Sequence, residues 1–495
     1  GGEASGGEAS GSSEDPAPES QAAALLGRAA APGAHVDPGG GPSGGGGGGS
    51  PGKRSVGPAR LRRYYGGWDA RALCGEDGGE WIDLQLDLAV SRRDAESLVA
   101  ILVTVQQGGH GAGGKLPQDS LLRVLKELYD LMGEGGIDSC RATSMRADLS
   151  SFGLCRVVVS LIKGLVAEPR VQHQAAGIVA RLAYDDDEER SGHLMELGVA
   201  SAMMSALKAN SMHQGVQQWG LMSVGNLCNA SEHRKCVLMD LGLGQVLVQA
   251  LRAHAASPGV QQWGLMAAGN LSNGSGDRKA LLMDLGVDQV LADALRTHAT
   301  HSGVQQWGLM AAGLLSNGSE HRSGRLLELG VGEALMAALR RHSDCPGVQQ
   351  WALSAAGNLI CNNEGRAEEL MAQGLGEALL TAFTLNPVHF GVQEQAMKVA
   401  GNLAYENEVR TGFLVSSGVV DLVAGAMRRH LARRGVQFRG CIALYFMAKY
   451  GGPATRQLLR DAKTPATQVL AARELHAQDT NGVVYWANYA LSQFA

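Results

Sequence analysis

The stretch GVQQWGLMAAGNL, which occupies residues 259–271, decides the fold because copies of it recur along the chain. Its first eight residues are repeated unchanged, and more divergent copies continue at the same step of 44 residues. A further copy, reduced to RVQ, precedes the first octapeptide by 45 residues. The copies begin at Arg170, Gly215, Gly259, Gly303, Gly347, Gly391 and Gly435. A period of this length is typical of solenoids, propellers and other repeat arrays.

Each repeat has the apolar spacing of helices. In the second copy, apolar or small residues recur at intervals of three and four, at Val216, Gly220, Val224 and Leu227. This spacing predicts a long helix with one buried stripe. Two shorter helices are predicted at residues 234–241 and 243–254, separated by a glycine that suits a helix end. Strand alternation is absent, so the sequence predicts an all-α solenoid of three-helix units.

Glycine also recurs inside the long helices, at Gly220, Gly264, Gly308 and Gly440. A glycine in a helix interior costs about 1 kcal/mol relative to alanine. Its recurrence therefore predicts that a neighbouring helix needs the space that a side chain would occupy.

The repeats resemble those of the armadillo family, whose long helix reads Val-Gln near its start, a small residue in its middle and Asn-Leu near its end. The matching segments are VQQWGLMSVGNL from Val216, VQQWGLMAAGNL from Val260, VQQWALSAAGNL from Val348 and VQEQAMKVAGNL from Val392. The resemblance is strong over about residues 165–450. It implies a right-handed superhelical solenoid whose long helices line a concave groove that binds extended peptides.

The chain divides into five predicted segments. Residues 1–60 are rich in Gly, Ser, Ala and Pro and are predicted to be disordered, because they hold too little apolar mass to offset the entropy of ordering. Residues 61–93 are predicted to form a linker and irregular lead-in. Atypical N-terminal repeats are expected at 94–164, armadillo repeats at 165–450 and capping helices at 451–495, because the end units of a solenoid face water on one side.

The resemblance also indicates which side chains would contact a bound segment. The candidates are four tryptophans and four asparagines on the long helices: Trp219, Asn226, Trp263, Asn270, Trp307, Trp351, Asn358 and Asn402. Seven residues at about 100° each return to within about 20° of the same direction, so a tryptophan and the asparagine seven residues later share one face. We predict a ladder of indole rings beside asparagines that pair with a partner's backbone.

Other interpretations of the same residues stay open. The indole rings could fill the seam between long helices, and the asparagines could cap or bridge neighbouring helices. The position at which nuclear import adaptors carry tryptophan is occupied here by Gly177, Met222, Met266, Met310, Ser354, Lys398 and Ile442. This departure argues against a transport role.

The predicted function is that of a protein interaction scaffold or adaptor, which is not an enzyme and holds an extended segment of a partner. One alternative is a targeting or autoinhibitory module of a larger regulatory protein. A second is nucleic-acid binding through an arginine row with the same period, formed by Arg190, Arg234, Arg278, Arg322, Arg366 and Arg410. Acidic neighbours such as Glu232 and Glu320 instead favour a solvated ridge of salt bridges.

The composition of the chain bears on its ligands and on its location in the cell. The net charge of −5 argues against general attraction to nucleic acid, and no hydrophobic run approaches a membrane span of about 18 residues. Eight scattered cysteines without a CxxC pair, and no visible signal peptide, favour the cytoplasm and also the nucleus. We expect no cofactor, because no phosphate-binding loop, zinc motif or nucleophile elbow is present. A periodic histidine row is spread over successive repeats, too far apart to share one metal ion.

Overall fold

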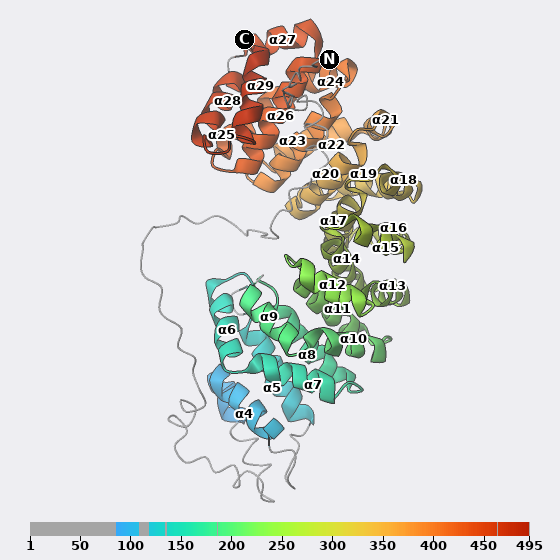
Figure 1. Cartoon of the computed structure of the whole chain (residues 1–495), viewed down its shortest axis with the longest axis vertical. Coiled ribbons are helices and arrows are strands. Elements are labelled where there is room, and N and C mark those ends of the chain that lie inside the picture. Colours follow the sequence, from blue (N-terminus) through green and yellow to red (C-terminus); the bar gives the residue numbers. More distant parts are fainter. Residues whose placement is uncertain (1–85, 108–117, 134–135, 186, 463, 495) are drawn as a thin grey trace, which may run out of the picture. The chain divides into compact units, whose positions relative to one another are not determined.

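The computed structural model describes residues 86–107, 118–133, 136–185, 187–462 and 464–494 (Figure 1). The segment 1–60, which we predicted to be disordered, lies outside the described residues. Within the described residues the regular secondary structure is helical and contains no strand, which confirms the all-α prediction.

The chain forms two compact units. The N-terminal unit contains the described residues up to Leu315 together with Arg325–Ala334, and the C-terminal unit contains Ser316–Gly324 together with the residues from Leu335 onward. Each unit is described here by itself.

The N-terminal unit starts with less regular helices and continues with three-helix repeats (Figure 1). The first helices are α4 (Ala95–Gln107), α5 (Gln118–Leu131), α6 (Cys140–Ser151) and α7 (Leu154–Gly164). The repeats follow as α8 (Pro169–Leu182), α9 (Glu188–Glu196), α10 (Val199–Ala209), α11 (Gln214–Cys228), α12 (Glu232–Asp240), α13 (Leu243–Ala253), α14 (Pro258–Ser272), α15 (Gly276–Asp284) and α16 (Val287–Thr297). The next three helices, α17 (Ser302–Ser316), α18 (Glu320–Glu328) and α19 (Val331–Arg341), run through the boundary between the units.

Two features of this unit differ from the sequence-based expectation. Residues 86–92 are helical and bury Leu86, although we expected an irregular lead-in as far as residue 93. Helix α6 was not expected at all. Its buried face carries a charged residue, Arg146, which breaks the apolar stripe. The guanidinium is satisfied by Asp185 (3.1 Å) and by the carbonyl of Ile137 (2.9 Å), contacts that periodicity alone does not reveal.

The C-terminal unit continues with the same three-helix order and ends with helices that cover the last repeat. Its helices are α20 (Pro346–Ile360), α21 (Glu364–Ala372), α22 (Leu375–Leu385), α23 (Phe390–Ala404), α24 (Glu408–Ser416), α25 (Val419–Arg429), α26 (Arg434–Tyr450), α27 (Gly452–Asp461), α28 (Thr464–Leu475) and α29 (Val483–Phe494). Helix α29 packs against α26 through Trp486, which is fully buried beside the rings of Tyr445 (5.8 Å) and Phe446 (6.2 Å). Aromatic packing thus ends the stack of repeats.

The first glutamine of each repeat holds the unit together. Gln261 at the start of α14 is buried, and its Nε2 donates to the carbonyls of Leu251 (2.8 Å) and His254 (3.0 Å). These carbonyls lie at the C-terminal end of α13, where the last carbonyls of a helix have no partner within the helix. The same pair of hydrogen bonds is made by Gln172, Gln217, Gln305, Gln349, Gln393 and Gln437.

Replacing Gln261 by leucine is expected to lower the free energy of unfolding by about 2 kcal/mol, because the buried Leu251 carbonyl loses its donor and the His254 carbonyl keeps only the Ser257 N–H. Urea denaturation of the full chain measures the change. The neighbouring Gln262 is only half-buried, so Gln262→Leu is the matched control and is expected to change stability by less than about 0.5 kcal/mol. Equal effects of the two substitutions would contradict this role of Gln261.

The recurrent glycines of the long helices lie against the preceding short helix. A Cβ atom at Gly264 would come within 2.6 Å of Leu251 Cδ2, and one at Gly308 within 2.7 Å of Leu295 Cδ2. Gly220 and Gly440 are similarly close to Leu207 and Met427. The prediction that a neighbouring helix needs this space is therefore confirmed.

The helices of a repeat are short. In the repeat from α11 to α13 they comprise 15, 9 and 11 residues. Among the described residues no single helix is long and apolar enough to cross a membrane, although two bent pairs, α12 with α13 and α24 with α25, reach that length and composition together.

Candidate functional site

The long helices of successive repeats pack side by side within each unit and carry all eight predicted site residues. In the N-terminal unit α8 contacts α11 and α11 contacts α14, and in the C-terminal unit α20 contacts α23 and α23 contacts α26. The structure therefore brings the predicted residues onto neighbouring helices. Whether they bind a partner stays a prediction.

The three tryptophans of the N-terminal unit are half-buried. Trp219, Trp263 and Trp307 pack against a cluster that includes Met222 and Met266, two of the methionines that replace the tryptophan of import adaptors. Each indole thus contributes to the seam between long helices while part of its ring stays accessible. Seam filling, one of the two interpretations left open by the sequence, therefore holds for these residues, and groove contact stays a prediction.

Three of the asparagines bridge successive long helices. The Nδ2 atom of Asn226 donates to the carbonyl of Ala180 (2.9 Å), and Asn270 donates in the same way to Gly225 (2.9 Å). In the C-terminal unit, Asn402 donates to the carbonyl of Gly357 (2.7 Å). Each amide has a second N–H and an oxygen in addition. The bridging role does not consume all of the hydrogen-bonding capacity that a bound backbone would need.

The predicted residues of α20 have different surroundings. Trp351 is only 9% exposed, so this ring belongs to the core. Asn358 is also buried, and its Oδ1 accepts a hydrogen bond from the ammonium group of Lys398 on α23. A charged side chain therefore fills the position that methionine occupies in the N-terminal repeats.

Lys398 is 2% exposed and lies in a cluster of buried charges. Burial, together with the nearby Arg439 guanidinium, lowers the pKa of Lys398 to about 7, although Cys361 and Glu394 act in the opposite direction. Burial also lowers the pKa of Arg439 and raises that of Glu394. The sequence showed only that Lys398 departs from the repeat pattern, whereas the structure shows that it is a buried cation.

Four of the six arginines in the row are buried and the other two, Arg322 and Arg366, are half-buried, which corrects the expectation of a solvated ridge. Arg234 is 3% exposed, and its Nε donates to the carbonyl of Leu227 (2.6 Å) at the end of α11. Arg190, Arg278 and Arg410 make the equivalent bond to Leu182, Leu271 and Leu403. The expected acidic partners are present, since Arg234 pairs with Glu188 at 2.6 Å. Guanidinium groups held in this way have protein acceptors for part of their donors.

The periodic histidines also connect repeats. Nε2 of His298 lies 2.7 Å from the carbonyl oxygen of Ala255, one repeat earlier, and His254 approaches Ser211 in the same way. In the described part of the chain no group of three or more His, Cys, Asp or Glu residues could hold a metal ion. The structure therefore gives this row a structural role.

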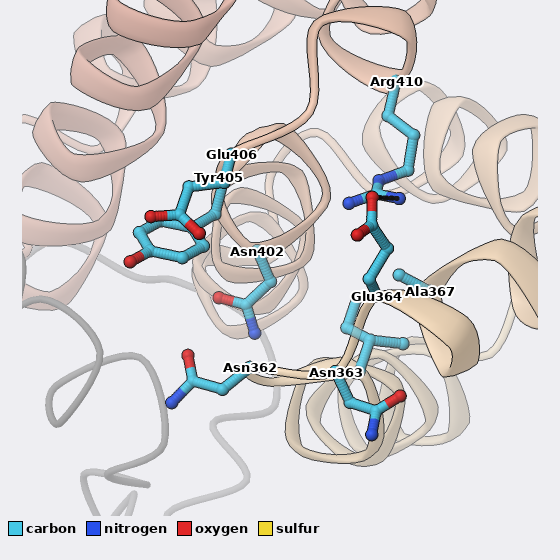
Figure 2. A pocket seen from close by; sticks show the side chains of 9 residues that line it. Asn362, Asn363, Glu364, Ala367, Asn402, Tyr405, Glu406 and Arg410 are labelled. Carbon is cyan, nitrogen blue, oxygen red and sulfur yellow. Dashed lines mark ion pairs between the residues drawn. The ribbon is translucent and has the colours of Figure 1, made fainter.

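A pocket of about 310 Å³ opens between two successive repeats of the C-terminal unit (Figure 2). The residues around it that carry polar groups are Asn362, Asn363, Glu364, Asn402, Tyr405, Glu406 and Arg410. In Figure 2 Arg410 and Glu364 point toward one another, and Asn402 extends from α23 toward the loop that carries Asn362. Of these residues only Asn402 was a predicted binding residue. The pocket depends on side chains more than 40 residues apart, so no local sequence signal could have located it.

Comparison with known proteins shows no matching family model and no matching curated protein sequence. Similar solved structures do exist. An engineered protein shares 20% identity with a TM-score of 0.60, over 88% of this chain and 98% of that chain. A structure reported for a phosphorylation switch in the interaction between cadherin and β-catenin shares 15% identity with a TM-score of 0.54, over 86% of this chain and 98% of that chain. A designed armadillo repeat protein in complex with the peptide (KR)4 is 20% identical with a TM-score of 0.42 and covers 50% of this chain.

At these identities the likeness concerns the fold. The described helices have the order of an armadillo unit, one long helix followed by two short ones, and the unit recurs every 44 residues. By fold, the chain is an armadillo-like repeat protein, an all-α solenoid.

Proposed function

We propose that the chain is a protein interaction scaffold or adaptor that binds an extended segment of a partner across its long helices. The observation that carries the proposal is the row of half-buried tryptophans, Trp219, Trp263 and Trp307, on long helices of the N-terminal unit. The rings pack against the cluster that contains Met222 and Met266, and part of the surface of each ring stays accessible. Indole rings in this setting stack on proline, aliphatic chains or cationic groups of a partner.

The asparagines support the same proposal. Asn270 lies seven residues after Trp263 on α14 and is half-buried, and its bond to Gly225 holds the amide in one orientation. An oriented amide can accept from and donate to the backbone of an extended peptide. A solved structure of similar fold belongs to the cadherin and β-catenin interaction, which is also between proteins.

A library of displayed ten-residue peptides, selected on the full chain, tests the proposal. We expect peptides to be enriched, and we expect Trp263→Leu and Trp307→Leu each to weaken the best peptide by about tenfold or more, because aromatic anchors dominate such interfaces. Leucine retains apolar packing on the methionines, so the fold is preserved.

The matched control is Leu281→Ser on α15, an exposed apolar residue outside the long helices. This variant should bind the selected peptide like the wild type. Failure to enrich any peptide would refute the proposal, and so would peptides whose affinity is unchanged in both tryptophan variants.

A further inference from the structure

Four arginines of the row form two pairs, Arg234 with Arg278 and Arg366 with Arg410, which differ at the N-cap of the short helix that carries the arginine. In α15 the N-cap is Ser275, whose hydroxyl accepts from the backbone of Arg278. Here the Arg278 guanidinium reaches Glu232 of the previous repeat at 2.8 Å. The equivalent pair, Arg234 with Glu188, is 2.6 Å apart, so a serine N-cap accompanies a closed ion pair.

An asparagine N-cap accompanies an open ion pair. In α24 the N-cap is Asn407, whose Nδ2 donates to Glu364 Oε1 (2.9 Å), and the distance from this oxygen to Arg410 Nη1 is 3.7 Å. One repeat earlier Asn363 donates to Glu320, and the corresponding ion pair is 3.6 Å long. The amide occupies the carboxylate oxygen that arginine binds in the serine repeats. Arg366 then donates to the backbone carbonyl of Glu320 (3.0 Å), whereas Arg410 is left with an unused donor.

This donor lies at the pocket shown in Figure 2. Arg410 is 8% exposed, and its buried Nη1 makes no hydrogen bond to any residue that the structure describes. Asn402, which is 7% exposed, contributes the complementary group. Its Nδ2 is bound to Gly357, which fixes the amide orientation, and its buried Oδ1 has no hydrogen-bond partner among the described residues. Leaving such groups unsatisfied costs about 1–3 kcal/mol each.

The ligand that fits must both accept and donate. A carboxylate would accept from Arg410 but could not donate to Asn402, and it would face the carboxylates of Glu364 and Glu406. An ammonium group would donate to Asn402 but would meet the Arg410 charge. A primary carboxamide supplies an acceptor and a donor with no net charge. The volume of about 310 Å³ lies at the lower end for ligand pockets and leaves room for a side chain together with part of the segment that carries it.

We propose that this pocket binds the carboxamide side chain of a glutamine or asparagine in the partner segment. Arg410 Nη1 donates to the amide oxygen, and Asn402 Oδ1 accepts from the amide nitrogen. The inference rests on the proposed function, because Asn402 is one of the predicted peptide-binding residues. It adds a preference for one residue type at one position of the bound segment.

The test uses the displayed ten-residue peptides selected on the full chain. We expect the enriched peptides to share glutamine or asparagine at one position. Changing that residue to glutamate or leucine should weaken binding by about tenfold or more, because a buried donor and acceptor are again left unpaired.

Asn407→Ser is the decisive variant. Serine keeps the N-cap, as Ser275 does in α15, but frees Glu364 to close on Arg410. The preference for glutamine over leucine should fall below about threefold, while urea stability stays equal or rises. Arg410→Met should abolish the preference as well. The substitution also removes the hydrogen bond from Arg410 Nε to the Leu403 carbonyl, and the urea midpoint of the variant measures the resulting loss of stability.

The outcomes separate the two proposals. If the chain enriches no peptide, the groove proposal is refuted and this one with it. If peptides bind but show no preference at any single position, or retain the preference in Asn407→Ser, the pocket proposal alone is overturned. Enrichment of glutamate or lysine at that position also overturns the choice of a carboxamide.

Discussion

Replacing Lys398 by methionine is expected to make the chain's stability less dependent on pH. Between pH 9.5 and pH 7 the free energy of unfolding of the wild type should fall by about 3 kcal/mol more than that of the variant. The folded-state pKa of about 7 lies below the ordinary 10.5, mainly because of burial. Between these values the unfolded chain binds more protons than the folded chain, so wild-type stability rises with pH and is lost as pH falls through 7. Each pKa unit corresponds to about 1.4 kcal/mol.

Methionine is a suitable replacement because Met222 and Met266 occupy the equivalent position in other repeats. The variant also loses the hydrogen bond to Asn358, which lowers stability by about 1 kcal/mol at every pH. The slope with pH, not the absolute stability, is therefore the signature.

Urea denaturation at pH 6, 7, 8 and 9.5 measures this slope. Lys208→Met removes an exposed lysine and controls for the loss of one positive charge. Parallel curves for wild type and Lys398→Met would show that Lys398 stays protonated when buried, with Glu394 as its counterion.

Replacing Arg278 by leucine is expected to lower the free energy of unfolding by about 3–5 kcal/mol. The guanidinium donates to the buried carbonyls of Leu271 (2.5 Å) and Asn273 (2.8 Å) as well as to Glu232. Removing it takes the donor from the Leu271 carbonyl and one of two donors from the Asn273 carbonyl, which also accepts from Lys235 Nζ (3.0 Å). It also separates the end of α14 from the start of α15. Urea denaturation of the full chain measures the loss.

Arg123→Leu is the matched control for this experiment. Arg123 pairs with Asp87 at 2.8 Å, the same distance as between Arg278 and Glu232. Both side chains of the Arg123–Asp87 pair are more than half exposed. Such a surface pair contributes at most about 1 kcal/mol. If both variants lose the same stability, the carbonyl contacts of Arg278 are not what holds the repeat together.

Polar side chains that recur with the repeat carry much of its stability. Gln261 satisfies the end of one helix, Arg278 joins a long helix to the next short one, and Asn270 and His298 reach into the preceding repeat. A repeat protein gains from such bonds because each unit meets only its neighbours. The same residues could have been taken for a binding or metal site on periodicity alone.

The sequence by itself determined the three helices of the 44-residue repeat and their order, although not helix α6 before the repeats. Apolar residues three and four apart within about 15 residues are enough to specify an amphipathic helix, and the 44-residue period specifies how often the unit returns. The placement of tryptophan and asparagine on one stripe of α14 follows from the same helical geometry.

Only the tertiary structure decided which polar side chains are buried and with what they pair. Arg278 and Arg410 each face a glutamate 46 residues earlier in the sequence, and Lys398 donates to an asparagine 40 residues earlier. Such distances along the chain become hydrogen-bonding distances only when repeats stack. The N-cap is serine in α15 and asparagine in α24. In α24 the amide of Asn407 and the guanidinium of Arg410 compete for one oxygen of Glu364 in the preceding repeat, and the ion pair between Arg410 and Glu364 is open.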